Sequence, residues 1–290
     1  MPLLINADDF GLTPGVNRSV AELHQTRALT SATLMATGAF FDDAIRVAKS
    51  HPTLEVGCHI VLVDGSPALP ASQIPSLCPG GQTLQPVLSR FAADLYTGQV
   101  HDAEIEAEAR AQIRRLQEAG LRVSHIDTHK HTHMFPRVLR PLLRAARACG
   151  IPAIRNPFEP RWALHATPGS SKMRRLAVVA LGSQRRAFFR LVYASGMVTT
   201  DGTIGVLATG TPDVEGALIG LLAALPATDP SATWELVCHP GYPDEHLDQV
   251  RTRLRASRAQ EHAALMDLIP RSGVPLSSWH ALGTPFLPPA

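Results

Sequence analysis

Short apolar runs alternate with amphipathic segments along most of the chain. The apolar runs predict buried strands at residues 2–7, 30–35, 54–60, 121–127, 151–155, 203–208 and 233–238, with a last short strand at 274–279. Helices are predicted between them, at residues 13–27, 42–50, 102–119, 136–149, 212–225 and 245–268. This alternation is typical of parallel strands joined by helical crossovers. Seven or eight such units favour an α/β fold, a distorted parallel (β/α) barrel, over an open sheet.

Two segments interrupt the alternation. The first, at about residues 63–100, is rich in Pro and Gly and predicts a long loop of the kind that covers binding sites. The second, at about residues 160–200, has no Asp or Glu and mixes seven Lys and Arg residues with large apolar ones. We expect a single domain over residues 1–290, with these two segments as excursions. The second excursion fits either a surface that lies against a membrane or an ordinary helical subdomain.

Composition adds limits to this picture. The net charge of +2 gives no reason to expect nucleic-acid binding, and 45% apolar residues are enough for a large core. The four cysteines are scattered without the spacing of a disulfide framework, which favours a reduced, intracellular protein. The sequence has neither the pattern of a signal peptide nor a run long enough to span a membrane. We therefore expect a cytoplasmic location.

The most unusual polar segment is residues 125–133, with the sequence HIDTHKHTH. In an extended chain, side chains at every second position point to the same side. One acid and four histidines would share that side: Asp127, His125, His129, His131 and His133. Imidazoles beside a carboxylate suit metal binding or proton transfer. A solvated polar loop is the alternative for the segment, and His125 fits either the core or a supporting role.

Other unusual polar residues also follow predicted strands. Asp8 and Asp9 follow the first strand, His59 ends the third, Arg155 ends the fifth, and His239 follows the seventh. In a parallel α/β barrel the carboxyl ends of all strands lie on one face, where such enzymes place their active sites. The shared position of these residues at the ends of different strands predicts an active site on that face.

The residue types suggest how such a site would work. Adjacent side chains on a turn diverge, so one of Asp8 and Asp9 could bind a metal while the other acts as a base. His59, together with Asp9 and His129, makes a two-histidine, one-carboxylate set that leaves positions open for water and substrate. Two imidazoles favour zinc or another first-row divalent ion over calcium.

Two residues at the strand ends have open roles. His239, in the rigid turn His-Pro-Gly, suits a general acid, and packing alone is the alternative. Arg155 could hold a carboxylate in place, stabilise developing negative charge, or form a plain salt bridge.

Four motifs together resemble the YdjC-like carbohydrate deacetylases. These are the sequences at residues 8–11, 57–59, 125–133 and 239–241. The similarity covers almost the whole chain. The basic excursion and the run from residue 200 to 210 are most similar to the hopanoid-biosynthesis-associated branch, HpnK. The resemblance implies a metal-dependent removal of the N-acetyl group from an amino sugar. It also implies a fold similar to the distorted barrel of glycoside hydrolases and polysaccharide deacetylases.

The resemblance also implies roles for individual residues. It makes Asp9, His59 and His129 the ligands of a divalent metal, with zinc preferred and magnesium or another ion as alternatives. It makes Asp8 the base and His239 the acid, with the order of the Asp pair open to exchange. Five further residues are expected to orient the ligands or to contact the substrate: His125, Asp127, His131, His133 and Arg155.

We therefore expect an enzyme that deacetylates an N-acetylglucosaminyl lipid, a hopanoid, to give acetate and a free amino sugar. The nearest alternative is the same reaction on a soluble N-acetylated oligosaccharide such as a chitooligosaccharide. A metal-dependent phosphoesterase and a non-catalytic sugar-binding protein are further alternatives. We also expect peripheral contact with the inner membrane face through residues 160–200, and a homodimer.

Overall fold

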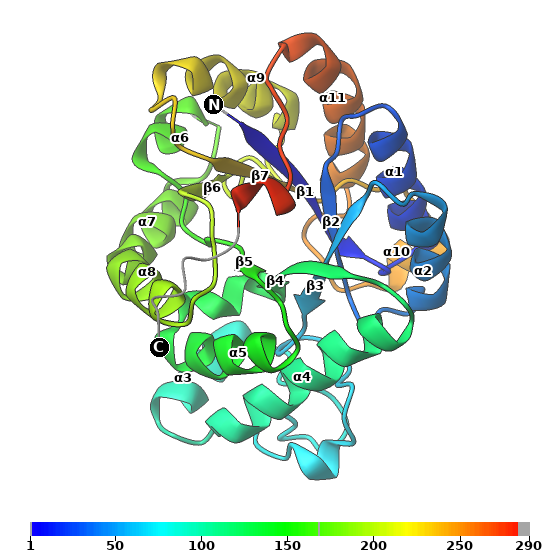
Figure 1. Cartoon of the computed structure of the whole chain (residues 1–290), viewed down its shortest axis with the longest axis vertical. Helices are drawn as coiled ribbons and strands as arrows, with labels where there is room; N and C mark the ends of the chain where they lie inside the picture. Colours follow the sequence, from blue (N-terminus) through cyan, green and yellow to red (C-terminus); the bar gives the residue numbers. More distant parts are fainter. Residues whose placement is uncertain (1, 168, 284–290) are drawn as a thin grey trace.

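Seven parallel strands form one curled sheet at the centre of the molecule (Figure 1). This structure is a computed structural model that describes residues 2–167 and 169–283. The strands are β1 (Leu3–Phe10), β2 (Ser31–Leu34), β3 (Glu55–Ile60), β4 (Val123–Thr128), β5 (Ala153–Ile154), β6 (Gly202–Ile204) and β7 (Trp234–Cys238). They lie in the order β5-β4-β3-β2-β1-β7-β6. The predicted α/β fold with a distorted parallel barrel is confirmed.

Helices surround the curled sheet, as Figure 1 shows. They are α1 (Pro14–Gln25), α2 (Phe41–Ser50), α3 (Leu88–Tyr96), α4 (Asp102–Glu118), α5 (Pro136–Ala148), α6 (Arg161–Ala166), α7 (Lys172–Leu181), α8 (Arg185–Ala194), α9 (Val214–Ala224), α10 (Glu245–Gln249) and α11 (Ser257–Ser272). The start of α1 follows from local sequence: the Thr13 hydroxyl accepts the backbone N–H of Val16, and Pro14 fits the first turn.

Strand β1 lies in the interior of the sheet, between β2 and β7. All eight of its residues are buried, as expected for a parallel strand covered on both sides. It is longer than predicted, because it continues through Asp8 and Asp9 to Phe10. The register with β2 shifts between Ala7 and Phe10, where Asp9 takes a left-handed φ of 63°. The two carboxylates therefore lie on an irregular strand end and not on a turn after the strand.

The histidine segment departs from the predicted extended conformation. Strand β4 ends at Thr128, and residues 129–134 form a 3₁₀ turn in which Lys130 and His131 have left-handed φ values of 57° and 51°. The Thr128 hydroxyl closes this turn, since it accepts the backbone N–H of His133 at 3.1 Å and also bonds to its ring. The prediction that Asp127, His129, His131 and His133 share one face of an extended chain is therefore wrong beyond Thr128.

The C-terminal third also differs from the prediction. The helix expected at 245–268 is two helices, α10 and α11, because the guanidinium of Arg255 binds the backbone carbonyls of Leu247, Asp248 and Val250 and so ends α10. The strand expected at 203–208 stops after three residues, before Gly205 with its φ of 93°. The last strand expected at 274–279 is reduced to a single bridge between Leu3 and Leu276.

The two predicted excursions fold in different ways. Residues 63–100 contain long loops, one 3₁₀ turn and α3, whereas residues 160–200 form α6, α7 and α8. Residue 168 of the second excursion, and residues 1 and 284–290 of the predicted domain, lie outside the described part of the chain. Within the described part, no helix is both long and apolar enough to cross a bilayer.

Candidate active site

A cavity of about 750 Å³ opens where the strands β1, β3, β4 and β7 end. It brings together residues from segments that are far apart in the sequence. Six of the predicted site residues line it: Asp8, Asp9, His59, His129, His131 and His239. The predicted convergence at the carboxyl edge of the sheet is therefore present in the structure.

Three side-chain atoms in this cavity form a nearly equilateral triangle. Nε2 of His59 lies 3.5 Å from Oδ1 of Asp9, Nδ1 of His129 lies 3.5 Å from the same oxygen, and the two nitrogens are 3.4 Å apart. Tetrahedral zinc ligands at about 2.1 Å from the ion are separated from each other by about 3.4 Å. The three donors can therefore hold one divalent ion without rearranging.

Asp9 supplies further evidence that these residues fit a metal. Its Oδ1 is buried and has no hydrogen-bond donor among the described residues, whereas Oδ2 accepts a bond from Arg258 at 2.5 Å. A buried carboxylate oxygen without a partner is unfavourable unless an ion or a ligand binds it. Burial opposes the charge of Asp9, but Arg258 and His129 outweigh it and hold the pKa of this carboxyl well below its usual value. The group therefore stays anionic, as a metal ligand must.

The orientation of His59 is fixed from behind by Asp127. The two residues are paired across β3 and β4, and Nδ1 of His59 lies 2.8 Å from Oδ1 of Asp127. Because Oδ1 of Asp127 is the acceptor of this bond, the neutral ring of His59 carries its proton on Nδ1 and directs the Nε2 lone pair into the cavity. Burial works against the charged ring, but Asp127 and the nearby Asp8 raise the pKa of His59 to about 9. Binding of a metal at Nε2 therefore displaces a proton.

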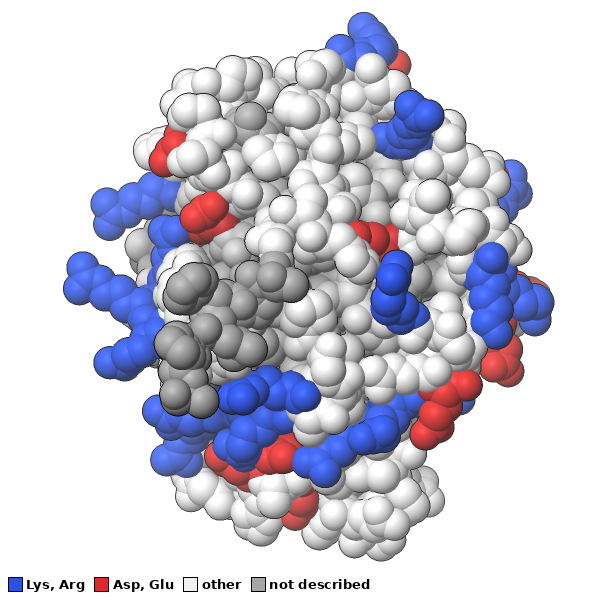
Figure 2. Space-filling model, viewed as in Figure 1, with Lys and Arg blue, Asp and Glu red and all other residues white. Residues whose placement is uncertain are grey.

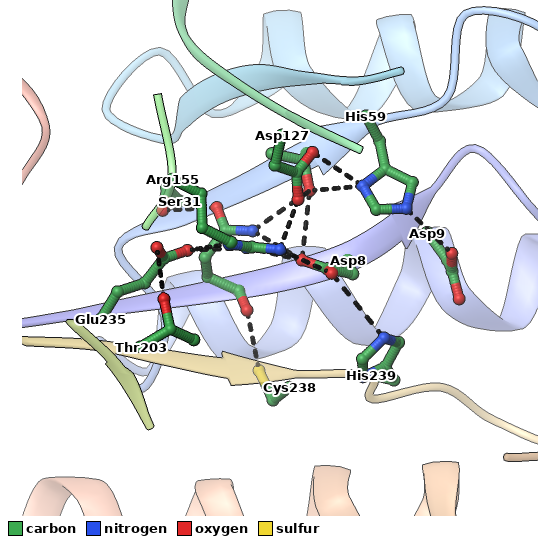
Figure 3. A network of polar contacts seen from close by, with 12 residues as sticks. Asp8, Asp9, Ser31, His59, Asp127, Arg155, Thr203, Glu235, Cys238 and His239 are labelled. Carbon is green, nitrogen blue, oxygen red and sulfur yellow. Dashed lines mark hydrogen bonds and ion pairs between the residues drawn. The ribbon is translucent and has the colours of Figure 1, made fainter. Parts of the chain in front are cut away.

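Arg155 lies at the centre of a buried network behind the cavity (Figure 3). Its guanidinium donates two parallel bonds of 2.7 Å to Asp8, and it also binds Asp127 and Glu235. Arg155 is fully buried and is not among the residues that line the cavity, and its contacts with Asp8 are those expected if it holds a carboxylate in place. Burial disfavours the charge of Asp8, but Arg155 outweighs it and keeps the pKa of this carboxyl below its usual range.

His239 lies beside Asp8 in the cavity. Its Nε2 lies 3.7 Å from Oδ2 of Asp8, and its Nδ1 lies 3.1 Å from the hydroxyl of Thr209. That hydroxyl donates to Glu261 at 2.5 Å, and Glu261 also accepts the backbone N–H of His239 at 2.6 Å. Burial lowers the pKa of His239. The ring is thus held at Nδ1 while Nε2 points toward the place where a substrate would lie.

The remaining histidines of the 125–133 segment have different surroundings. His125 is buried, stacks on Trp279 at 4.1 Å, and fills the space in front of Gly57, so it belongs to the core. His131 lines the cavity, and burial lowers its pKa to about 3. His133 is buried behind the 3₁₀ turn, bonded to Thr128. These two histidines therefore differ, since His131 is placed to meet a substrate and His133 stabilises the turn.

The backbone around the cavity is unusual. Among the described residues, five that are not glycine have a left-handed φ, and four of them line the cavity: Asp9, Asp64, Lys130 and His131. The ammonium of Lys130 forms an ion pair with Asp64, which joins two of these positions. Such conformations are unfavourable by about 1 kcal/mol or more each and concentrate at functional sites.

Another group of acids and a histidine, Asp8, His59 and Asp127, is also close enough to bind a metal. Its carboxylates are already engaged by Arg155, and the Nδ1 of His59 is bonded to Asp127. In the described part of the chain this leaves a single open donor set, the one made by Asp9 and its two histidines. A two-metal centre is therefore disfavoured.

Sequence reasoning missed several residues of the site. Arg258 binds Asp9, Glu235 binds Arg155, and the pair Thr209 and Glu261 supports His239. Two of these, Arg258 and Glu261, lie in α11, within the helix that was predicted without any functional role. A charged pair on a helix usually faces solvent, so only the unexpected burial of both side chains reveals their role.

Comparisons with known proteins agree with this geometry. A family model described as YdjC-like protein matches residues 2–271. A carbohydrate deacetylase from Brevibacillus brevis is 42% identical over 158 residues, which is 54% of this chain and 60% of that protein. A carbohydrate deacetylase from Oceanobacillus iheyensis is 34% identical over 152 residues, 52% of this chain and 64% of that protein. The matched part thus spans less than two thirds of the length of these relatives.

Solved structures with the same fold include two proteins with different names. A protein from Enterococcus faecalis, named for cellobiose-phosphate cleavage, is 25% identical with a TM-score of 0.75, and the match covers 98% of this chain and 99% of that chain. A lactam utilization protein from Thermus thermophilus is 15% identical with a TM-score of 0.51, covers 96% of this chain and 100% of that chain, and shares the fold alone. Since the family model spans nearly the entire described chain, the protein belongs to the YdjC-like family.

Proposed function

We propose that this protein is a metal-dependent carbohydrate N-deacetylase that hydrolyses the N-acetyl group of an amino sugar. The observation that carries the proposal is the open triangle of Asp9, His59 and His129 in a cavity that also contains Asp8 and His239. One ion site with an anionic carboxylate and an imidazole, Asp8 and His239, in the same cavity suits hydrolysis of an amide. The names of the relatives, carbohydrate deacetylases, support the same class of reaction.

In this proposal Asp9, His59 and His129 hold the metal. When bound, the metal supplies Lewis-acid polarisation of the acetamide carbonyl and lowers the pKa of a water molecule. Asp8, kept anionic and fixed by Arg155, accepts the proton of the attacking water. The protonated ring of His239 gives its own Nε2 proton to the nitrogen of the leaving amine. The C–N bond breaks, and the products are acetate and a free amino sugar.

Acetate release tests the proposal directly. The purified protein is incubated with a chitooligosaccharide before and after treatment with a chelator, and then with zinc or magnesium added back. We expect release of acetate that chelation abolishes and one of the two ions restores. Release that survives complete removal of the metal would exclude the metal-dependent mechanism. Binding of the sugar without any acetate would favour the non-catalytic sugar-binding alternative.

Which N-acetylated glycan this protein deacetylates is a separate proposal. Membership of the hopanoid-associated branch, an N-acetylglucosaminyl lipid as substrate, and a homodimer stay predictions. A soluble oligosaccharide is compatible with the same site. A two-metal phosphoesterase is disfavoured because Arg155 already engages Asp8 and Asp127. Parallel assays on a chitooligosaccharide and on an N-acetylglucosaminyl lipid in detergent would rank the two glycans.

We further propose that Thr209 positions His239. The Thr209 hydroxyl has one proton, which it donates to Glu261, so toward Nδ1 of His239 it can only accept. Nδ1 therefore carries a proton in both charge states of the ring, and Nε2 is the atom that exchanges protons in the cavity.

Replacing Thr209 with valine, of nearly the same shape, is expected to lower kcat about tenfold to a hundredfold, because a bond lost by a buried polar group is worth ~1–3 kcal/mol. Thr209→Ser keeps the hydroxyl and should restore most of kcat. Steady-state kinetics of both variants, with KM reported separately, measures the effect. Equal losses in the two variants would assign Thr209 a packing role and remove the positioning proposal.

A further inference from the structure

Helix α7 (Lys172–Leu181) turns its apolar side toward solvent. Four exposed residues with the i, i+3, i+4, i+7 spacing of one helix face make up this apolar stripe: Met173, Leu176, Ala177 and Ala180. Met173 is 78% exposed and Leu176 is 64% exposed. A helix that packs only against its own protein faces such a stripe toward the core. In α7 not a single described residue is buried, so the stripe has no partner within residues 2–167 and 169–283.

The opposite side of α7 is held against the protein by arginines. The guanidinium of Arg174 donates to the backbone carbonyls of Val206, Leu207 and Thr209 at 2.6, 3.4 and 3.1 Å. Arg175 donates to the carbonyl of Thr167 at 3.1 Å. These bonds fix the rotation of the helix about its axis. The outward position of the apolar stripe is therefore a built feature of the fold, because turning it inward would break all of them.

Exposed cations lie on α7 and on the adjoining helix α8, and acids are absent from this part of the sequence. Residues 160–200 contain no Asp or Glu. The exposed basic residues on α7 and the adjoining α8 are Lys172, Arg185, Arg186 and Arg190. Figure 2 shows Lys and Arg side chains projecting from the left edge of the molecule, where Figure 1 places these two helices. The surface of these two helices thus combines an apolar stripe with exposed positive charge.

We propose that this surface of α7 and α8 docks on an anionic lipid bilayer. Interfacial helices insert an apolar face at the boundary between headgroups and acyl chains and place Lys and Arg beside the lipid phosphates. The surface of α7 and α8 has both features, an exposed apolar face and exposed Lys and Arg side chains. A second copy of the chain fits less well, because a two-fold contact would set the cations of one protomer against those of its partner.

The docking surface is connected to the cavity. Val206 and Thr209, whose carbonyls bind Arg174, both line the cavity. Docking would therefore bring this wall of the cavity to within about one helix diameter, ~10 Å, of the lipid surface. If the proposed deacetylation is correct, a sugar attached to a lipid could enter the cavity while its tail stays in the bilayer. This last step rests on the proposed function, whereas the docking itself does not.

Vesicle co-sedimentation tests the docking. The probes are vesicles of equal parts phosphatidylglycerol and phosphatidylcholine, and vesicles of phosphatidylcholine alone. We expect the wild-type protein to pellet with the anionic vesicles, to pellet much less with the neutral ones, and to be released by salt. The double variant M173E/L176E should bind at least tenfold more weakly. Ile219→Glu on α9 is the matched control, because it places the same acid at another exposed apolar position, and it should bind as the wild type does.

Three outcomes would overturn the docking. These are failure of the wild type to pellet with anionic vesicles, equal pelleting of M173E/L176E, and equal loss of binding in Ile219→Glu. Thermal unfolding of each variant checks that it is folded, which is expected because all three side chains are exposed. Acetate release from a soluble chitooligosaccharide should be the same in M173E/L176E and the wild type. Absence of acetate release by the wild type from both the chitooligosaccharide and an N-acetylglucosaminyl lipid in detergent would reject the proposed function and leave the vesicle result to decide the docking.

Discussion

Replacing His129 with alanine is expected to remove nearly all acetate release and to lower the metal content of the purified protein. The imidazole supplies one of three donors that lie 3.4–3.5 Å from each other, so its loss leaves two ligands. Lewis-acid stabilisation is worth several kcal/mol, and each 1.4 kcal/mol corresponds to a factor of ten in rate, so kcat/KM should fall by about 10³-fold or more. Acetate assays and metal analysis by mass spectrometry measure the two effects.

His129 suits this experiment because the side chain lies on the 3₁₀ turn at the cavity and is 22% exposed, so that the fold should tolerate the change. His51→Ala is the control, since that histidine caps α2 far from the cavity and should leave activity and metal content unchanged. A variant that keeps full metal content and full activity would remove His129 from the ligand set. A variant that loses activity but keeps its metal would give His129 a role toward the substrate instead.

Replacing Arg155 with methionine is expected to destabilise the protein by about 3–5 kcal/mol, the range for removing one partner of a buried ion pair. The variant leaves three buried carboxylates without their cation: Asp8, Asp127 and Glu235. The midpoint of urea unfolding should therefore fall with little change in slope. Without Arg155 burial is no longer offset, so the folded-state pKa of Asp8 rises above its unfolded value, and that of Glu235, which burial already raises to about 7, rises further; the folded variant therefore takes up protons. Its loss of stability should then be largest at neutral pH and should shrink as the pH falls.

Arg144→Met is the control, because it makes the same substitution at an arginine whose ion pair is exposed. Arg144 pairs with Glu106 at 2.6 Å, but its side chain is 50% exposed. Exposed pairs contribute about 0–1 kcal/mol, so this variant should unfold close to the wild-type midpoint. Similar losses in the two variants, or a loss in Arg155→Met that grows toward low pH, would contradict the buried network described above.

The positions of the site residues along the chain could be predicted because they depend on topology. Once the strands are parallel, the residues after each strand must gather at one edge, whatever the details of packing. That argument located Asp8, Asp9, His59 and His239 at the cavity. It needed only the alternation of apolar runs and amphipathic helices, which a parallel sheet imposes on its sequence.

The local backbone could not be predicted in the same way. The left-handed conformations of Asp9, Lys130 and His131 are uncommon for any residue other than glycine and are imposed by surrounding contacts, so local propensity points elsewhere. The partners on α11 were equally hidden. Arg258 and Glu261 are separated from Asp9 and His239 in the sequence, and their burial follows from how the helix docks on the sheet. Long-range packing of this kind has no signature in a single sequence.

The pairing of β1 with β7 has a consequence for how the protein is made. Leu3 to Ala7 lie in register with Trp234 to Cys238, so the first strand of the chain receives its second neighbour from one of the last. Ribosomes add roughly 5–20 residues per second, so one edge of β1 waits on the order of ten seconds or more for its partner during synthesis. During that time β1 presents an unpaired hydrophobic edge that invites association with other nascent chains. Chaperone demand and the onset of activity should therefore both be set by the arrival of the segment that carries β7, His239 and α11.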